Sequence, residues 1–298
     1  MVNDKNNHFI YLYILLLAAY VLYVTNENVF NETEKNQWIY SGQEDLQKFI
    51  LKHKSIDAII IGGSNSAAGI SAELLSKLTN KNFYNLSESS EGLSDSDYLN
   101  TITLKTSNLD RKNIRIIIYS TIKFFSNDEN RINNIVLNKQ KIKFLPRRSI
   151  ASIIKQKLMH SFKNYFPNNE EYGDRKITNY YDKYKTTYVF NKSLPINIFV
   201  ENLKELKKNY QKLFPNSIFI VVSPTIYNKD PEFQNNFVNE LSKELLKNEI
   251  KFIPQPPISS FYPIWKDPIH LNLEGREIRT NELYKLIQNN YDFNNLFK

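Results

Sequence analysis

The sequence predicts an α/β fold in which a parallel sheet is covered by helices on both faces. Short apolar runs alternate along the chain with longer segments of helical periodicity. The apolar runs have no alternating polar face, which is typical of strands buried on both sides in a parallel sheet. With 298 residues, the chain is long enough for one good-sized core.

The first half of this alternation lies between residues 57 and 119. A strand is expected at 57–61, where the run DAIII ends in Gly62-Gly63, a glycine turn. A helix follows at 70–78 because its apolar residues recur three and four apart. A second short strand is expected at 82–86, and a helix at 93–104 has Ser94 or Asp95 near its N-cap. The run IRIIIY at 114–119 predicts the third strand.

The second half begins after a long gap. An amphipathic helix is expected at 196–213 and leads into SIFIVV at 217–222, the fourth strand. A further helix at 233–246, a short strand at 251–253 and a closing helix at 274–287 complete the pattern. In such a sheet, ligands bind beyond the carboxyl ends of the strands.

The domain organisation follows from the segments that do not fit this alternation. Residues 1–26 are expected to be a membrane anchor and the polar residues 27–54 a stalk with a helical stretch near 43–52. Residues 55–298 form the α/β domain. Within it, 126–195 is too long for a connecting loop, so we expect an insertion with structure of its own.

The anchor is expected because Phe9–Val24 contains no charge and no strongly polar group. Its sixteen residues are slightly fewer than the roughly 20 that span a bilayer, but tyrosines near both ends suit the interfaces. A cleaved signal peptide and a buried core helix are the alternatives, although no small-x-small cleavage site follows Leu22. Lys5 precedes the segment and acids follow it, which places the N-terminus inside and the domain outside.

The net charge of +8 is concentrated in one stretch of the insertion. Eight basic residues and no acid lie between 139 and 163: Lys139, Lys141, Lys143, Arg147, Arg148, Lys155, Lys157 and Lys163. A local patch of this kind does not suit a nucleic-acid-binding face spread over a domain, so no nucleic-acid partner is expected. The chain has no cysteine, which excludes disulfides, thiolate metal sites and cysteine nucleophiles, and no metal or other cofactor is expected.

Ser64 is the first candidate for chemistry, since it follows the first strand through Gly62-Gly63. A serine there lies at the carboxyl edge of the sheet, and its N–H lies near a helix N-terminus that favours an anion. This position suits a nucleophile and one donor of an oxyanion hole. The alternatives are a plain glycine turn or a phosphate-binding loop, although the spacings GxGxxG and GK[ST] are both missing.

His270 is the second candidate, within the segment Asp267-Pro-Ile-His270. The chain has four histidines, and the other three precede the anchor, precede the first strand or lie in the basic insertion. A serine nucleophile needs a base with a near-neutral pKa, and Asp267 could orient that imidazole. The alternative is an exposed aspartate and a structural histidine.

Taken together, these segments resemble the SGNH (GDSL-like) hydrolase superfamily. Gly62-Gly63-Ser64 is similar to its first block, with Gly63 in place of the usual aspartate, and Asp267-Pro-Ile-His270 matches its DxxH block. Asn85-Leu86 followed by Gly92 resembles the second block. The third block, GxND, has no match, and Asn127 lies too far beyond the third strand to be assigned to it.

The resemblance implies a flavodoxin-like three-layer α/β/α sheet and a Ser-His-Asp triad of Ser64, His270 and Asp267, with the N–H groups of Ser64 and Gly92 in the oxyanion hole. The chain is also similar to single-anchor domains that lie on the outer side of the bacterial cytoplasmic membrane, periplasmic or extracellular. These add or remove O-acyl groups on cell-surface polysaccharide, as O-acetyltransferases or esterases. An integral-membrane acyl exporter is then an expected partner. A catalytically degraded scaffold that binds glycan or organises a biosynthetic complex is the alternative, favoured by the missing third block.

One amphipathic stripe lies within the insertion. Residues 149–166 place Ile150, Ile153, Ile154, Leu158 and Phe162 at helical spacing. The stripe either packs on the core of the domain or lies on an anionic membrane surface or a membrane partner.

Overall fold

The computed structural model describes residues 11–20, 42–87, 95–121, 125–126, 171–174, 177, 192–193, 195–224, 231–255, 265–267, 270–291 and 296–297. The chain divides into two compact units, one of Met1–Gly42 with Phe144–Pro167 and one of Gln43–Lys143 with Asn168–Lys298. The second unit contains the sheet, the helices around it and every predicted site residue.

Five parallel strands form the central sheet, in the order β2-β1-β3-β6-β7. The strands are β1 (Ala58–Gly62), β2 (Phe83–Asn85), β3 (Ile116–Ser120), β6 (Ile218–Val222) and β7 (Lys251–Ile253). After β2 the chain crosses back and adds the remaining strands on the other side of β1, so the order reverses between β1 and β3. This is the flavodoxin-like order, with its ligand crevice expected at that reversal.

The strands are buried on both faces, as the continuous apolar runs predict. Ala58 and Ile60 of β1 contribute to one core cluster, whereas Ile59 and Ile61 contribute to the other. The register of β1 with β3 runs from Ala58 opposite Ile116 to Gly62 opposite Ser120, so both strands end at the same level. The carboxyl ends of the two central strands therefore form one edge of the domain.

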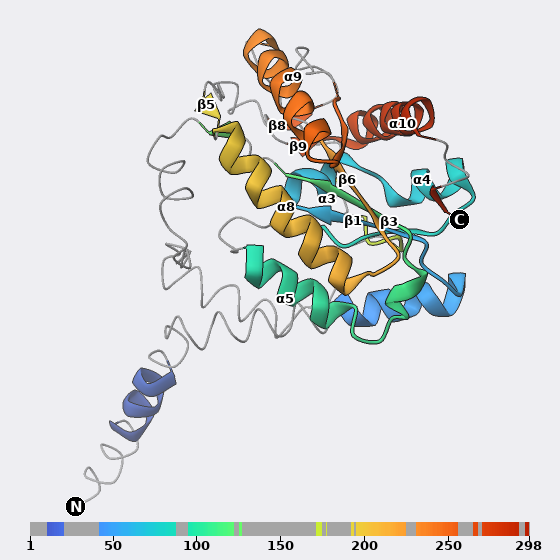
Figure 1. The fold of residues 1–298 in the computed structure, drawn as a ribbon. Coiled ribbons are helices and arrows are strands. Elements are labelled where there is room, and N and C mark those ends of the chain that lie inside the picture. The colour runs from blue at the N-terminus through green and yellow to red at the C-terminus, as the bar shows by residue number, and fades with distance from the viewer. Residues whose placement is uncertain are drawn as a thin grey trace, which may run out of the picture. The chain divides into compact units, whose positions relative to one another are not determined.

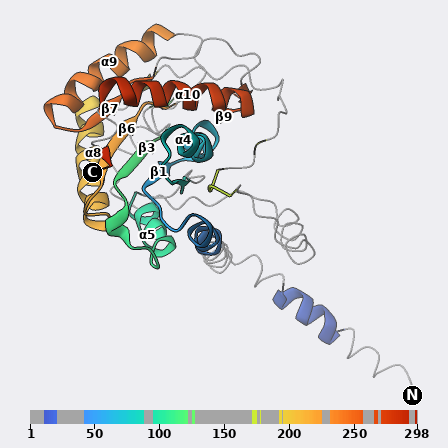
Figure 2. The ribbon, with the colours of Figure 1, turned by 90° about the vertical axis from the view of Figure 1, so that its right-hand side faces the viewer.

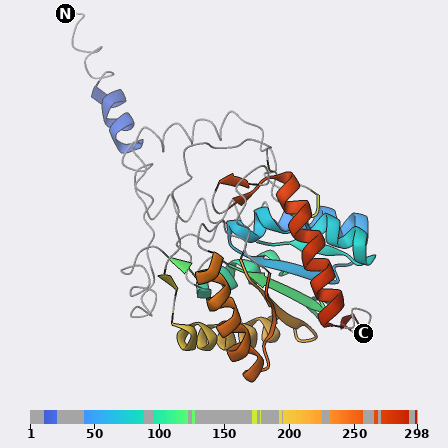
Figure 3. The same cartoon turned by 90° about the horizontal axis from the view of Figure 1, so that it is seen from above.

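Helices cover the two faces of the sheet (Figures 1 and 3). One face carries α5 (Asp95–Lys105), α8 (Ile196–Leu213), α9 (Pro231–Lys247) and the helix at 42–53. The other face carries α4 (Ala72–Thr79) and α10 (Leu273–Asn290), while α3 (Ser64–Gly69) lies at the end of β1. The short 3-10 helix η1 (Arg111–Asn113) leads into β3. This arrangement confirms the predicted α/β class.

Two parts of the chain differ from the predicted organisation. The helix at 42–53 belongs to the core rather than to a stalk, because Leu46 and Phe49 are buried beneath the sheet. The domain therefore begins before the boundary expected at residue 55. A helix also begins at Ser64, six residues before the first expected helix. The small residues Ser, Asn, Ala and Gly of α3 have no apolar periodicity that could have predicted it.

The insertion expected at 126–195 begins and ends at neighbouring positions. Strand β4 (Phe125–Ser126) pairs antiparallel with β5 (Lys192–Ser193), and α8 starts directly afterwards. The chain therefore leaves the α/β domain and returns to it at one place. The basic run and the amphipathic stripe lie outside the described residues.

Residues 11–20 are the described part of the segment expected to be the anchor, and they are helical. Among the residues that the structure describes, no helix has both the length and the apolar character needed to cross a membrane.

Lys105, at the end of α5, is a charged group buried beside the helix at 42–53. Its side chain is 6% exposed, and burial lowers its pKa to about 8, an effect that the charge of Asp45 partly opposes. The unfolded chain therefore binds more protons than the folded chain between pH 8 and the ordinary lysine pKa. Stability must rise with pH in that window.

We predict that the free energy of unfolding increases by about 2 kcal/mol between pH 7 and pH 9.5 through Lys105 alone, given a folded pKa near 8. Lys105→Met should remove this increase and be more stable than the wild type at pH 7. Urea denaturation of both proteins at the two pH values measures the difference. An equal pH dependence in the two proteins would contradict the buried state of the ammonium group.

Candidate active site

The site begins at the end of β1, where Gly62 lies against the end of β3. Gly62 has φ +150°, and a Cβ at this position would lie 1.8 Å from the carbonyl oxygen of Ser120. Any side chain here would push the two strand ends apart. Ser66 Oγ donates to the same Ser120 oxygen at 3.0 Å, which fastens α3 to β3. The glycine that the sequence indicated as a turn is thus required by a close backbone approach.

Ser64 is the first residue of α3 and follows the N-cap residue Gly63. Only 8% of Ser64 is exposed. The first N–H groups of an α-helix have no acceptor within the helix and carry partial positive charge, so they favour a negative charge in front of them. The strand-to-helix turn therefore places the Ser64 hydroxyl and its own N–H at the carboxyl edge of the sheet.

His270 reaches this edge from the other end of the chain. It begins β9 (His270–Leu271), which pairs antiparallel with β8 (Trp265–Asp267). Strand β9 leads directly into α10 (Figure 2). Asn272 caps α10 by accepting a hydrogen bond from the N–H of Gly275 at 2.9 Å. The cap fixes where the helix starts, and His270 lies two residues before it.

The structure brings Ser64 and His270 together, although 206 positions separate them. His270 Nε2 lies 2.9 Å from Ser64 Oγ. When the imidazole is neutral and protonated on Nδ1, Nε2 accepts the hydrogen bond from the serine hydroxyl. A serine whose proton can pass to an adjacent imidazole is an activated nucleophile.

Asp267 lies close to His270 along the backbone. The two residues are paired in the β8–β9 ladder, which turns back between them. The side chain of Asp267 lies outside the described part of the structure, so its orienting role stays a prediction. Gly92 and Asn127 also lie outside the described residues.

Tyr98 of α5 is a further residue of the site that the sequence did not indicate. Its hydroxyl accepts a hydrogen bond from Gly62 N–H at 2.9 Å, and it lies 3.0 Å from Gly62 O and 3.3 Å from Leu86 O as a donor. One phenol thus joins the ends of β1 and β2. Desolvation raises the pKa of Tyr98 well above its ordinary value, so the phenol stays neutral. No spacing in the sequence relates Tyr98 to Gly62.

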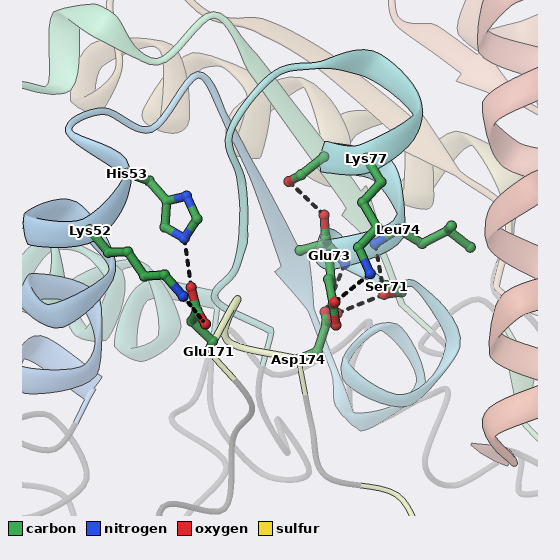
Figure 4. Close-up of polar contacts among 10 residues, drawn as sticks. Lys52, His53, Ser71, Glu73, Leu74, Lys77, Glu171 and Asp174 are labelled. Atoms are coloured by element: carbon green, nitrogen blue, oxygen red, sulfur yellow. Dashed lines mark hydrogen bonds and ion pairs between the residues drawn. The ribbon is translucent and has the colours of Figure 1, made fainter.

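Asp174, within the expected insertion, fixes the helix that follows α3 (Figure 4). Its buried carboxylate accepts hydrogen bonds from Ser71 Oγ at 2.8 Å, from Ala72 N–H at 2.8 Å and from Glu73 N–H at 3.1 Å. The N–H groups of Ala72 and Glu73 are free donors at the N-terminus of α4. Desolvation raises the pKa of Asp174, and the hydrogen bonds from α4 partly oppose the shift. The insertion therefore stabilises the element next to the candidate nucleophile.

The same segment is attached to β2 through its backbone. Asn85 N–H donates to Tyr172 O at 2.9 Å, and Asn85 Nδ2 donates to Asp174 Oδ1 at 3.2 Å. Gly173 has φ +74°, and a Cβ there would lie 2.3 Å from Asn85 O. Nearby, Glu171 forms an ion pair with Lys52 and a hydrogen bond with His53, each at 2.7 Å (Figure 4). Asn85 thus holds the insertion against the sheet.

A buried arginine holds α10, and with it the end of β9, against the sheet. Arg279 is 1% exposed, and its Nη2 donates to Ser223 O, just after β6, at 3.0 Å. Gln255 Nε2, just after β7, donates to Arg279 O at 3.3 Å. Burial lowers the pKa of Arg279 to about 9, partly opposed by Glu282. Three elements are therefore joined behind His270.

The described residues contain no cluster of three or more histidine, aspartate or glutamate side chains able to hold a metal ion. The chemistry that the arrangement supports directly is nucleophilic attack by Ser64 with His270 as base.

Comparisons with known proteins find only distant similarity. No family model and no curated protein matches the chain. Among solved structures, a family two carbohydrate esterase from Clostridium thermocellum, in complex with cellohexaose, is similar at 11% identity and a TM-score of 0.43, over 80% of this chain and 65% of that one. An acetyl xylan esterase from Butyrivibrio proteoclasticus follows at 12% identity and 0.39, over 80% and 65%.

A candidate GDSL-like lipase from Parabacteroides merdae is similar at 12% identity and a TM-score of 0.39, over 78% of this chain and 97% of that one. Our chain matches less than two thirds of the length of the two esterases. At such low identity and overall similarity, the assignment of chemistry rests on Ser64 and His270 themselves.

We predict that Tyr98→Phe lowers the unfolding free energy by about 1–3 kcal/mol, because it leaves buried backbone groups at Gly62 without a partner. It should also slow the reaction of Ser64 with a fluorophosphonate under conditions where the variant is fully folded. Tyr84→Phe is the matched control, since Tyr84 is also buried but makes no hydrogen bond to this turn. Equal labelling rates for wild type and Tyr98→Phe would show that Tyr98 does not affect the reactivity of Ser64.

Proposed function

We propose that this chain is a serine-dependent acyl-transfer enzyme that acts on O-acyl groups of cell-surface polysaccharide. The observation that carries the proposal is the 2.9 Å contact between Ser64 Oγ and His270 Nε2 at the carboxyl edge of the sheet. A hydroxyl and an imidazole placed in this way, beside the N-terminus of a helix, match the requirements of acyl transfer.

In the first half-reaction, Ser64 Oγ attacks the carbonyl carbon of the acyl ester, and its proton passes to His270 Nε2. The carbonyl oxygen becomes an oxyanion, which the N–H groups of Ser64 and Gly92 would stabilise. When the carbonyl re-forms, the bond to the alcohol breaks, and the leaving oxygen takes the proton from His270. The products are an acyl-serine and the free alcohol.

In the second half-reaction, His270 removes a proton from a second hydroxyl, whose oxygen attacks the carbonyl carbon of the acyl-serine. The bond from the acyl group to Ser64 Oγ then breaks, and Ser64 Oγ takes the proton from His270. Water as acceptor makes the enzyme an esterase, and a sugar hydroxyl makes it an O-acyltransferase, including an O-acetyltransferase. Both outcomes use Ser64, His270 and Asp267 in the same roles. Asp267 would hold the imidazole in the required tautomer and stabilise its charged form.

The polysaccharide substrate and the membrane location rest on the sequence. Phe9–Val24 is proposed as a single-pass anchor in the bacterial cytoplasmic membrane, with the domain on the outer side. An enzyme held there would meet envelope glycans, and an integral-membrane acyl exporter would supply its acyl donor. A degraded scaffold is the competing hypothesis, and the short Ser64–His270 contact favours the enzyme.

We predict that Ser64→Ala and His270→Ala each reduce hydrolysis of a small acetyl ester by roughly 10³-fold or more, because they remove the nucleophile and the base. Asp267→Asn should reduce it less. His53→Asn is the control for the histidine, since His53 lies before β1 at the opposite edge of the sheet. Circular dichroism should show every variant folded. Wild-type turnover by folded His270→Ala would refute the assigned base.

The proposed orientation has its own test. A reporter enzyme that is active only outside the cytoplasm, fused after Lys298, should be active in cells. Activity restricted to a reporter that works only in the cytoplasm would overturn the orientation and the envelope substrate with it.

A further inference from the structure

A groove of about 410 Å³ lies between the second half of α8 and the turn that leads into β7. The described residues that line it are polar or basic apart from one isoleucine: Lys204, Lys207, Lys208, Gln211, Lys212, Asn248 and Ile250. Four of these carry a positive charge, and none of the described lining residues is acidic. The groove therefore offers many hydrogen-bond donors around a small apolar contact.

The lysines are arranged along one face of α8. Lys204, Lys208 and Lys212 are exposed and follow one another at four-residue intervals, so they span about 12 Å of the helix. Like charges at this spacing destabilise a helix slightly, and they add nothing to the core. Lys204 is paired with Glu201 at 2.7 Å, whereas Lys208 and Lys212 have no acidic partner among the described residues.

One lysine of the groove is already held in place. Lys207 is half-buried, and its Nζ donates to Glu249 O at 2.9 Å. This bond joins α8 to the turn between α9 and β7, so it fixes the two walls of the groove relative to each other. Less of the binding free energy would then be lost in ordering the site.

The groove is remote from Ser64. Ile250 immediately precedes β7, and the end of α8 leads into β6, so the groove lies at the amino ends of these strands. Ser64 and His270 lie at the carboxyl edge of the same parallel sheet. A molecule in the groove would leave the hydroxyl of Ser64 accessible.

We propose that this groove binds an acidic glycan, a sugar polymer that carries carboxylate or phosphate groups, and so retains the polymer on the enzyme. The lysine row matches a linear series of negative charges, and the Gln211 and Asn248 amides are suited to sugar hydroxyls. The two amides beside the lysines favour a sugar polymer over a bilayer surface, because they can donate to and accept from hydroxyl groups. This inference rests on the proposed function, because it names the class of glycan that Ser64 would act on.

The test measures binding of polygalacturonate to the full chain in neutral detergent by titration calorimetry, with dextran as the uncharged polymer. We expect Lys204→Gln, Lys208→Gln and Lys212→Gln together to weaken polygalacturonate binding by roughly tenfold or more. Each exposed pair of a lysine and a polymer carboxylate contributes modestly to the binding free energy, and three are removed. Binding should weaken with added salt. A control variant with Lys48, Lys112 and Lys285 changed to glutamine has the same net charge and should bind like the wild type.

Further measurements separate a failure of the glycan groove from a failure of the proposed function. The groove variant should still hydrolyse a small acetyl ester at the wild-type rate, and Ser64→Ala should still bind the polymer. Polymer binding by a protein whose Ser64 neither hydrolyses the ester nor reacts with a fluorophosphonate would refute the proposed function alone. The proposal of a glycan groove would be overturned if the control variant bound polygalacturonate as weakly as the groove variant, or if dextran bound as tightly as polygalacturonate. It would also be overturned if the groove variant lost only its binding to anionic vesicles. Binding of inorganic phosphate as tight as that of the polymer would overturn it too.

Discussion

The close approach of Gly62 to Ser120 is the constraint on which the candidate site depends. Strands β1 and β3 lie on either side of the point where the strand order reverses, and they end at the same level. Because Gly62 has no Cβ, the Ser120 carbonyl can occupy the space beside it and accept the Ser66 hydroxyl. The chain then turns at once into α3, with Ser64 as its first residue. A longer or looser turn would move Ser64 away from His270.

Buried polar groups, rather than apolar packing alone, hold this edge together. Tyr98 satisfies backbone groups of Gly62 and Leu86, and Asp174 satisfies the start of α4. Arg279 joins α10 to the ends of β6 and β7. Burying such groups is costly unless they are hydrogen-bonded, so each one constrains the backbone that it contacts. A serine and a histidine far apart in the sequence can therefore be held within hydrogen-bonding distance.

The fold was largely predictable because strands buried on both faces appear in the sequence as short, continuous apolar runs. The expected helix at 196–213 and strand at 251–253 have the same bounds in the structure as α8 and β7. Ser64 could be singled out because it follows the first strand through Gly62-Gly63, and His270 because the chain has four histidines. Their catalytic roles stay a prediction. By contrast, α3 has no apolar periodicity, and Leu46 and Phe49 lie in a segment whose polar composition suggested a stalk. Tyr98 and Asp174 act through tertiary hydrogen bonds, which leave no regular spacing in a sequence.

Activation of Ser64 by His270 is the step on which the proposed reaction depends. The most direct measurement is peptide mass spectrometry of the full chain after brief exposure to a fluorophosphonate, at low reagent concentration and neutral pH. We predict one covalent adduct, on the peptide that contains Ser64, and its near absence from folded His270→Ala. An unmodified Ser64 in the wild type, or equal labelling without His270, would contradict it.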